Sequence, residues 1–391
     1  MDILKREMLS KRVRQVKASG IRKFFDIINT MPDVISLGVG EPDFVTPEHI
    51  RQAGIRSIQE GHTRYTSNYG LLELREEIAT TLQRRYGLVY DPRTQILVTV
   101  GVSEGVDLAM RTILDPGDEV ISPDPGYVAY EADIIFAGGV PVPVPTFAQY
   151  NFGVRAAEIA AAITPRTKMI LLGNPNNPTG AVIPRAELEG IAKLAVEHDL
   201  VVAVDEVYSR LVYGIEHVSI AALPGMQERT ILLDGFSKAY AMTGWRVGYV
   251  AAPSHVLEAM LKVHQYTIMC AGTTAQEAAL EALRHGEDDV KAMHDDYERR
   301  GRMFVEGLNR IGLSCGEPKG AFYAFPYIGG TGMSDEEFAE KLLFEEEVAV
   351  VPGSSFGDAG KGYIRCAYCT AYDRLEEALV RMERFLKKHQ Q

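Results

Sequence analysis

The chain has 391 residues, of which 46% are hydrophobic and 24% are charged, a balance typical of a globular protein of about two domains. Its formal net charge is −12, and this acidic excess argues against a nucleic-acid partner, because a phosphate backbone is itself negative. Charges interrupt the apolar residues at the N-terminus, and no run approaches the roughly 18 apolar residues of a membrane span. We therefore expect a soluble, cytoplasmic protein with no membrane partner.

The first part of the chain predicts helices and buried strands in alternation. Amphipathic helices are expected at residues 4–17 and from Leu71 to Tyr86, and a further helix is expected from about Ser103. Short apolar runs predict strands at Ile96–Val100, Met169–Leu172, Val201–Val204 and Thr230–Leu233. This alternation is typical of an α/β domain with a largely parallel sheet.

The pattern changes after about residue 285. A long charged helix is expected from there to Arg310, and a last helix at Tyr372–Lys388. Strand candidates lie between them at Ala321–Ala324, Val348–Val351 and Tyr363–Cys366. These elements predict a second, smaller α/β domain.

Polar motifs follow three of the predicted buried strands. They are Asn174–Gly180, Asp205–Tyr208 and Gly235–Lys238. Ligands of open α/β sheets bind at the carboxyl ends of the strands, so three such motifs in succession favour a ligand site at that edge.

Lys238 is the first candidate for chemistry at this edge. A surface lysine is usually solvated, but Lys238 follows an apolar strand and precedes a stretch of small residues that ends at Arg246. A recessed lysine amine has a lowered pKa and forms Schiff bases with carbonyls such as that of pyridoxal phosphate. Arg246 and the helix start at Gly101-Val102-Ser103 together predict a phosphate cradle.

Asp205 and Arg365 are the two charged candidates beside the lysine. A carboxylate such as Asp205 would keep a cofactor pyridine nitrogen protonated, and Tyr208 could donate to the ring oxygen. The alternative for Asp205-Glu206 is a helix N-cap. Arg365 lies among apolar neighbours and would bind a substrate carboxylate; the alternative is an internal salt bridge.

The four cysteines are interpreted as structural. Cys270 and Cys315 stand alone, and Cys366 and Cys369 form a single CxxC without the second pair that a zinc site needs. We expect no metal and no disulfide framework.

Motifs along nearly the whole chain resemble those of one enzyme family. They are Ser36–Asp43 (SLGVGEPD), Tyr65–Gly70 (YTSNYG), Pro125–Tyr127, Asn177–Gly180 (NPTG), Gly235–Tyr249 and Arg365. On these residues the chain resembles the class I and II aminotransferases, which belong to the pyridoxal-phosphate fold-type I superfamily. The resemblance implies a large cofactor-binding domain at residues 49–285 and a small domain formed by residues 1–48 and 286–391.

The resemblance also implies a role for each matching residue. Lys238 would hold pyridoxal 5'-phosphate and shuttle protons, while Asp205 would pair with the pyridine nitrogen. The substrate α-carboxylate would be bound by Arg365, Asn177 and the main chain at Gly40. Further cofactor contacts would come from Val102, Ser103, Tyr127, Asn177, Tyr208, Ser237 and Arg246. Tyr65 would reach the phosphate of a neighbouring subunit, which implies a homodimer with shared sites.

The chain departs from the family pattern at one position. Many members carry a phosphate-binding serine three residues before the lysine, where this chain has Gly235. One donor is therefore missing, and Ser237 and the other anchors would have to suffice. The resemblance also implies a cis peptide bond between Asn177 and Pro178.

Other enzyme classes fit the sequence less well. A nicotinamide dehydrogenase is disfavoured because Asp43 stands where the third glycine after Gly38-Val39-Gly40 belongs. A transcription regulator on this fold would need a DNA-binding domain, for which the stretch before residue 36 is too short. A carbon–sulfur β-lyase stays open, since it would share the fold and most anchors.

The substrate side chain is the least determined feature. We expect 2-oxoglutarate as amino acceptor and aspartate or an aromatic amino acid as donor, with aspartate slightly ahead on family frequency. Arg22 and Lys23 could meet a distal carboxylate, whereas Ile21, Phe24 and Tyr69 could form an apolar lid over a larger side chain.

Overall fold

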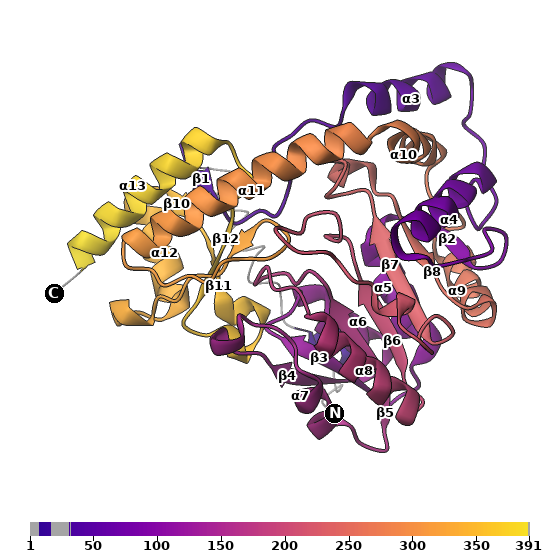
Figure 1. Ribbon diagram of the computed structural model, residues 1–391, viewed down its shortest axis with the longest axis horizontal. Coiled ribbons are helices and arrows are strands. Elements are labelled where there is room, and N and C mark those ends of the chain that lie inside the picture. Colours follow the sequence, from indigo (N-terminus) through magenta and orange to yellow (C-terminus); the bar gives the residue numbers. More distant parts are fainter. Residues whose placement is uncertain (1–7, 17–30, 32, 390–391) are drawn as a thin grey trace, which may run out of the picture.

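In the computed structural model, which describes residues 8–16, 31 and 33–389, seven strands form a central sheet in the order β2-β8-β7-β6-β5-β3-β4 (Figure 1). Strand β8 is antiparallel to both of its neighbours, and the remaining strands are parallel to one another. The carboxyl ends of the parallel strands and the amino end of β8 therefore meet at one edge. In sheet order the strands are β2 (Ile96–Thr99), β8 (Gly248–Ala251), β7 (Thr230–Gly235), β6 (Val201–Asp205), β5 (Thr167–Gly173), β3 (Glu119–Asp124) and β4 (Val140–Pro145).

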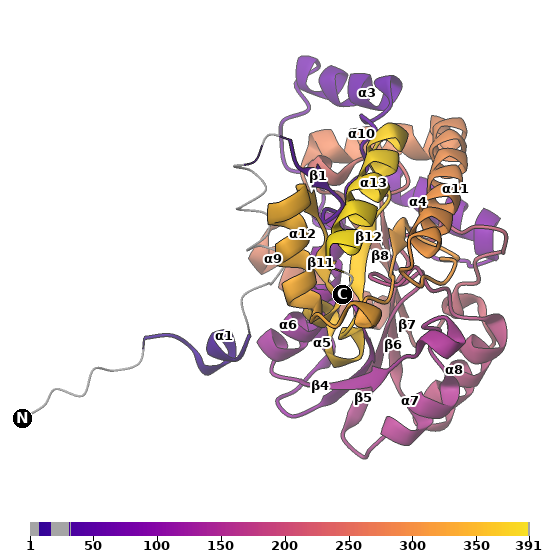
Figure 2. The same cartoon turned by 90° about the vertical axis from the view of Figure 1, so that its left-hand side faces the viewer.

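Helices cover both faces of this sheet, as Figures 1 and 2 show. Helices α6 and α9 each pack on α5, and α3 and α4 pack on α10. The helices of this part are α3 (Glu48–Gln59), α4 (Leu72–Tyr86), α5 (Gly101–Ile113), α6 (Val128–Ala137), α7 (Ala156–Ala162), α8 (Arg185–Glu197), α9 (Ser254–Thr267) and α10 (Thr273–His285). A short helix, α1 (Lys11–Gln15), contacts α6, where Arg12 donates to the Phe136 carbonyl (3.1 Å).

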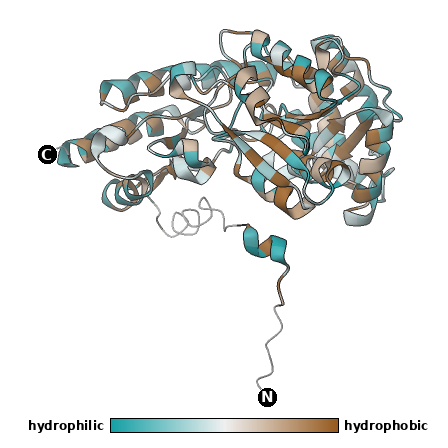
Figure 3. Cartoon of the chain, turned by 90° about the horizontal axis from the view of Figure 1, so that it is seen from below, coloured by the Kyte–Doolittle hydropathy of each residue, from teal (hydrophilic) through white to brown (hydrophobic). Residues whose placement is uncertain are grey.

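The sheet is apolar on both faces, which is why its strands read as unbroken hydrophobic runs. Met169 and Leu171 of β5 belong to one buried cluster, and Ile170 and Leu172 belong to another. Successive strand side chains point to opposite faces, so these two clusters are the two layers of core between sheet and helices. Figure 3 shows the same contrast, with hydrophobic strands inside and helices of mixed hydropathy outside.

A second group of elements packs beside the sheet. It contains α11 (Glu287–Arg310), α12 (Asp335–Glu346) and α13 (Tyr372–His389) with the short strands β1 (Ile35–Ser36), β9 (Tyr323–Ala324), β10 (Val348–Ala349), β11 (Val351–Pro352) and β12 (Ile364–Ala367). Strand β1 pairs in parallel with β10, and the other three form an antiparallel sheet in the order β11-β12-β9. Phe304, Phe338 and Phe385 are fully buried in its core.

The α/β fold with a mostly parallel central sheet is confirmed. The helix expected at residues 4–17 is described only in part, as α1, because residues 1–7 and 17–30 lie outside the described part of the chain. The division into residues 49–285 and residues 1–48 with 286–391 stays a prediction. Among the described residues, no helix is long and apolar enough to cross a membrane.

Candidate active site

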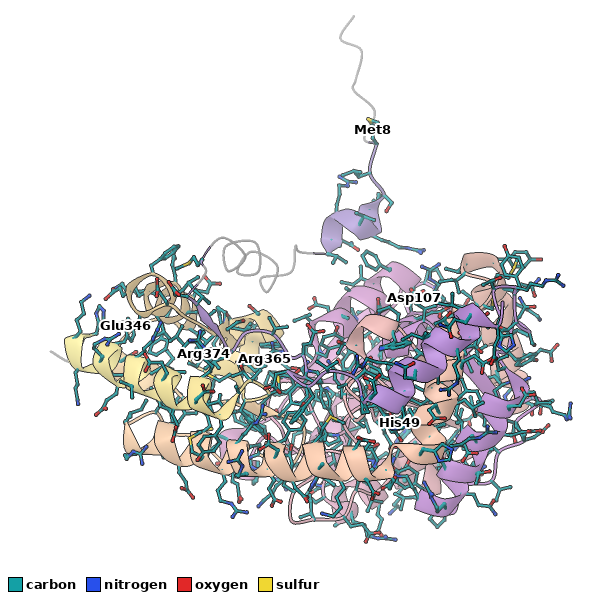
Figure 4. All side chains as sticks on the ribbon, turned by 90° about the horizontal axis from the view of Figure 1, so that it is seen from above. Met8, His49, Asp107, Glu346, Arg365 and Arg374 are labelled. Carbon is teal, nitrogen blue, oxygen red and sulfur yellow. The ribbon has the colours of Figure 1, made fainter. Side chains whose placement is uncertain are left out.

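The strand ends meet at a cavity of about 420 Å³ between the central sheet and the second group of elements. Figure 4 shows Arg365 at the junction of these two parts. Eleven of the twelve residues proposed from the sequence for this site line the cavity, and Tyr65 is the one that does not. The lining residues are Gly38, Gly40, Val102, Ser103, Val106, Tyr127, Val128, Tyr130, Pro175, Asn177, Asp205, Val207, Tyr208, Ser237, Lys238, Thr243, Arg246, Tyr323 and Arg365.

Lys238 lies in the turn after β7, with its amine inside the cavity. Its Nζ donates to the carbonyl oxygen of Gly40 at 2.7 Å. The pKa of the amine is lowered to about 8, mainly by burial and also by the charge of Arg365, against the opposing effect of Cys369, Glu41 and Asp205. Close to neutral pH the amine is therefore readily deprotonated, as a nucleophile and proton carrier requires.

Asp205 ends β6 and is 8% exposed. Its Oδ1 accepts from the backbone N–H of Val207 (3.1 Å), and its Oδ2 accepts from the Tyr130 hydroxyl (2.9 Å). Burial raises the pKa of the carboxyl to about 6. A turn, not a helix, follows Asp205, so the helix N-cap alternative is wrong.

Two tyrosines flank this carboxylate region. The Tyr208 hydroxyl is hydrogen-bonded to the Tyr323 hydroxyl at 2.7 Å. The Tyr127 ring packs edge-on against Tyr130, with ring centroids 5.4 Å apart. Both Tyr127 and Tyr208 line the cavity, where each presents an aromatic ring to a bound ligand.

An anion cradle forms where α5 begins beside β8. Gly101 has φ +73°, and a Cβ there would lie 2.6 Å from Nη2 of Arg246, so both backbone and space require glycine. Val102 and Ser103 follow in the first turn, where N–H groups have no acceptor within the helix. The Arg246 guanidinium donates to the Thr243 carbonyl (3.1 Å) and lines the same cavity.

Gly235 is closely packed against this cradle. A Cβ at Gly235 would lie 3.0 Å from Cγ2 of Val102 and 3.1 Å from Cα of Gly248. The departure from the family serine therefore has a packing counterpart, because Val102 fills the space beside residue 235.

Arg365 lies in β12 and is 3% exposed. Its Nη1 donates to Oδ1 of Asn177 (2.9 Å), and its Nη2 donates to the carbonyl of Gly38 (2.6 Å). Within residues 8–16, 31 and 33–389 no carboxylate forms an ion pair with it, so the internal salt bridge alternative is not found there. Arg365 is therefore a buried cation facing a cavity, without an anionic partner in the described part of the chain.

Some of the residues named from the sequence lie elsewhere. Tyr65 is 81% exposed and does not line the cavity. Tyr69 packs in the core, with the guanidinium of Arg75 5.4 Å from its ring. Ile21, Arg22, Lys23 and Phe24 lie outside the described residues.

The cysteines form no metal cluster in the described part of the chain, and all four are free thiols. Cys369 is buried behind the site, where its thiol donates to the carbonyl of Glu41 (3.1 Å). The peptide bond between Asn177 and Pro178 is cis, as predicted.

Three aromatic residues of the site were missed by the sequence analysis. Tyr130 hydrogen-bonds Asp205, and Tyr323 hydrogen-bonds Tyr208. The guanidinium carbon of Arg365 lies 4.6 Å from the ring centroid of Tyr323 and 4.8 Å from that of Phe356. Tyr130 lies three residues after Tyr127 in a helical pattern, which would place both on one face; Tyr323 and Phe356 look like ordinary core residues.

Comparison with known proteins gives the same assignment. A family model described as aminotransferase class I and II matches residues 32–382. The chain belongs to the class I and II aminotransferases. It is an enzyme that transfers amino groups. A putative aminotransferase of Bacillus subtilis, YugH, is 57% identical to the chain over 380 residues, which cover 97% of this chain and 98% of that protein.

Two further relatives are named for the two kinds of amino-acid donor that the sequence leads us to expect. An aspartate aminotransferase of Pyrococcus abyssi is 47% identical over 383 residues, covering 97% of this chain and 98% of that protein. The crystal structure of an aromatic aminotransferase from Pyrococcus horikoshii superposes with a TM-score of 0.90 at 46% identity, covering 93% of this chain and 99% of that one. The resemblance to aspartate and aromatic aminotransferases, and the fold-type I architecture, are thus confirmed.

The lowered pKa of Lys238 predicts how its reactivity depends on pH. Only the neutral amine attacks a carbonyl, so the rate at which Lys238 forms a Schiff base with an added aromatic aldehyde should rise with pH to a midpoint near 8. Stopped-flow absorbance between pH 6 and 10 measures this midpoint, and Lys238→Ala controls for attachment elsewhere. A midpoint near the ordinary 10.5 of lysine would show that the amine is not desolvated.

Proposed function

We propose that this aminotransferase moves the amino group of an L-amino acid, aromatic or aspartate, to 2-oxoglutarate, with pyridoxal 5'-phosphate held by Lys238 as a Schiff base. The observation that carries the proposal is the charge arrangement of the cavity. A buried carboxylate, Asp205, and a buried guanidinium, Arg365, border the same space as a lysine whose pKa is lowered. When bound, the cofactor supplies an electron sink for the bonds of the substrate α-carbon.

The residues present fit this cofactor at each of its groups. Asp205 accepts only two hydrogen bonds and has a raised pKa, so a protonated ring nitrogen would stabilise its charged form. The start of α5 offers backbone N–H donors to a phosphate, and the guanidinium of Arg246 offers a positive charge with two parallel donors. Tyr127 would stack on the ring, and Tyr208 and Asn177 would contact the ring oxygen. Ser237 replaces the missing serine as a side-chain donor.

Lys238 is the residue that moves protons. With a pKa of about 8 the free amine would take a proton from the substrate α-carbon onto Nζ and later give it up again, so one group would serve as base and then as acid. The Gly40 carbonyl, 2.7 Å away, holds the amine while it is free. The nearby rings of Tyr208 and Phe322, each with its centroid 5.8 Å from Nζ, exclude water from it.

Arg365 orients the substrate. Its two terminal nitrogens are already fixed by Asn177 and Gly38, so the guanidinium plane is set before a carboxylate arrives. A preset fork loses little entropy on binding and selects a planar α-carboxylate. The main chain at Gly40 borders the same region of the cavity.

The lining favours an aromatic donor over aspartate. Lys238, Arg246 and Arg365 are the cations that line the cavity in the described part of the chain, and each already has a role. A distal carboxylate, whether of aspartate or of the acceptor 2-oxoglutarate, would therefore need a cation from outside these lining residues, whereas Val106, Val128 and Pro175 offer apolar surface to an aromatic side chain.

A homodimer is part of the proposal. Tyr65 belongs to a loop that is tied to the α9–α10 connection, because Asn68 donates to the Met269 carbonyl (2.9 Å) and Thr273 donates to the Arg64 carbonyl (2.9 Å). The exposed apolar residues Tyr266, Ile268 and Met269 lie in or beside that connection and support an interface. From such a face Tyr65 would reach the phosphate of a second subunit. A cytoplasmic location stays a prediction.

Single half-reactions test the donor assignment. Each amino acid is mixed alone with the yellow, cofactor-loaded enzyme, and loss of the colour is followed by stopped flow. We expect phenylalanine and tyrosine to bleach the enzyme fastest and aspartate more slowly, because none of the cations that line the cavity among the described residues is left for its second carboxylate. Rapid bleaching by alanine alone, or release of ammonia and pyruvate instead of a new amino acid, would contradict the proposed aminotransferase specificity.

Replacing Arg365 tests the substrate clamp. A charge-assisted hydrogen-bonded pair contributes about 1.5–3 kcal/mol, so Arg365→Ala should weaken amino-acid binding roughly 10- to 100-fold or more. Arg365→Lys should restore little of the amino-acid binding, since an ammonium lacks the two parallel N–H donors of a guanidinium. Arg384→Ala on α13, an exposed arginine paired with Glu346, is the matched control. An unchanged KM for the donor in Arg365→Ala would return this arginine to a structural role.

Mixed dimers test the shared site. If Tyr65 acts on the partner's cofactor, an inactive Lys238→Ala subunit still contributes an intact Tyr65 to the site of its partner. That site then contains both Lys238 and Tyr65. Refolding Tyr65→Phe subunits with an excess of Lys238→Ala subunits should therefore raise activity per Tyr65→Phe subunit. Activity that stays proportional to the Tyr65→Phe content, or a fully active monomer in sedimentation assays, excludes the shared site.

A further inference from the structure

Tyr323 occupies a position between three parts of the site that no sequence motif connects. It lies on β9, is 1% exposed and lines the cavity. Its hydroxyl is hydrogen-bonded to the hydroxyl of Tyr208, which follows β6 of the central sheet. This bond therefore joins the small antiparallel sheet to the carboxyl edge of the central sheet.

The ring of the same tyrosine contacts the substrate clamp. The guanidinium carbon of Arg365 lies 4.6 Å from the centroid of the Tyr323 ring. The two residues come from adjacent antiparallel strands, β9 and β12, in which Tyr323 is paired with Ala367. A guanidinium close to an aromatic ring is attracted by the ring quadrupole, so the ring restrains Arg365 in the orientation that binds a carboxylate.

The hydroxyl of Tyr323 also sets the position of the Gly40 segment. A Cβ built at Gly40 would lie 1.9 Å from this hydroxyl oxygen and 2.8 Å from Cζ, so only glycine allows the two to approach. The carbonyl of Gly40 accepts from Lys238. Tyr323 thus touches, directly or through one neighbour, the residues assigned to the substrate carboxylate, the amine and the ring oxygen.

We propose that Tyr323 is a positioning residue that couples Arg365 to Tyr208: its ring orients the guanidinium, and its hydroxyl donates to Tyr208 and makes that phenol a stronger donor toward the cofactor. This inference rests on the proposed function for the role of Tyr208. A phenol has one O–H, so Tyr208 can donate to a ring oxygen only if it receives the shared hydrogen bond from Tyr323. Chains of hydrogen bonds strengthen one another by roughly 10–30% per bond.

Removing the hydroxyl and removing the ring should have separate effects. Tyr323→Phe keeps the ring, so KM for the donor should change less than about twofold. The weakened Tyr208 would stabilise a negative ring oxygen less, so the pH midpoint of the bound cofactor's absorption change should rise by roughly 0.2–0.7 pH unit. Tyr323→Leu should also raise KM, by about 2- to 30-fold, because the ring beside Arg365 is lost.

A matched control separates this role from a general packing role. Tyr368 is a buried tyrosine of the same core whose hydroxyl donates to the Ala321 carbonyl (3.3 Å) and which does not line the cavity. Tyr368→Phe should leave both the spectral midpoint and KM unchanged. An equal shift in Tyr323→Phe and Tyr368→Phe, or no shift in Tyr323→Phe, overturns the proposal.

The interaction between the two hydroxyls can also be tested on the apoenzyme, without cofactor binding or turnover. The unfolding free energies of Tyr208→Phe, Tyr323→Phe and the double variant should be non-additive, because the first change already leaves the other hydroxyl unpaired. Additive changes would show that the two hydroxyls do not interact, even in an active enzyme. If the wild-type enzyme instead fails to bind the cofactor, the proposed function fails while this coupling can still be measured.

Discussion

The guanidinium of Arg365 is 3% exposed, and burying an ion costs several kcal/mol, on the order of 3–5 when its partner is missing. The chain offsets part of this cost with the amide oxygen of Asn177, the carbonyl of Gly38 and the rings of Tyr323 and Phe356. None of these carries a negative charge. The positive charge that remains on Arg365 attracts an anionic ligand. The chain segments that contain Asn177, Gly38, Tyr323 and Phe356 meet at this guanidinium. Arg365 thereby connects β12 of the second group of elements with Asn177, which follows β5 of the central sheet.

Burial shifts the pKa of two ionisable groups of the cavity, and each shift is in the direction that suits the proposed cofactor. It raises the pKa of Asp205 to about 6 and lowers that of Lys238 to about 8. A cationic ring nitrogen beside Asp205 would restore the charged form that burial disfavours, and an anionic carboxylate beside Arg365 would supply the negative partner that the described residues do not provide. Lys238 between them needs no such partner, because its function requires the neutral amine. The same low polarity therefore strengthens two contacts and activates a third group.

The sequence predicted the parts of this site that follow from strand order. Asp205, Asn177 and Lys238 follow buried parallel strands, whose carboxyl ends necessarily share an edge. Arg365 was identified because a charge among apolar strand residues needs a partner. Tyr323 and Phe356 could not be identified in this way, since a buried aromatic residue in a short strand or turn is indistinguishable from core. Their role depends on how two sheets are placed against each other, which no local pattern encodes. Tyr130 was accessible in principle, one helical turn beyond Tyr127, but its hydroxyl partner lies 75 residues further along the chain.

The loss of the family serine at Gly235 is best understood from the packing of three glycines. A Cβ at Gly248 would lie 2.8 Å from the carbonyl carbon of Gly101 and from the nitrogen of Val102, and a Cβ at Gly235 would meet the Val102 side chain. The first turn of α5 therefore lies directly on the backbone of β8, and the Val102 side chain packs against Gly235 of β7. The chain lacks one hydroxyl donor at position 235, but the close packing of α5 holds the N–H groups of the helix start at the edge of the cavity. Because backbone donors on a fixed helix need no side-chain ordering, this arrangement can bind an anion without the serine, with Arg246 supplying the opposite charge.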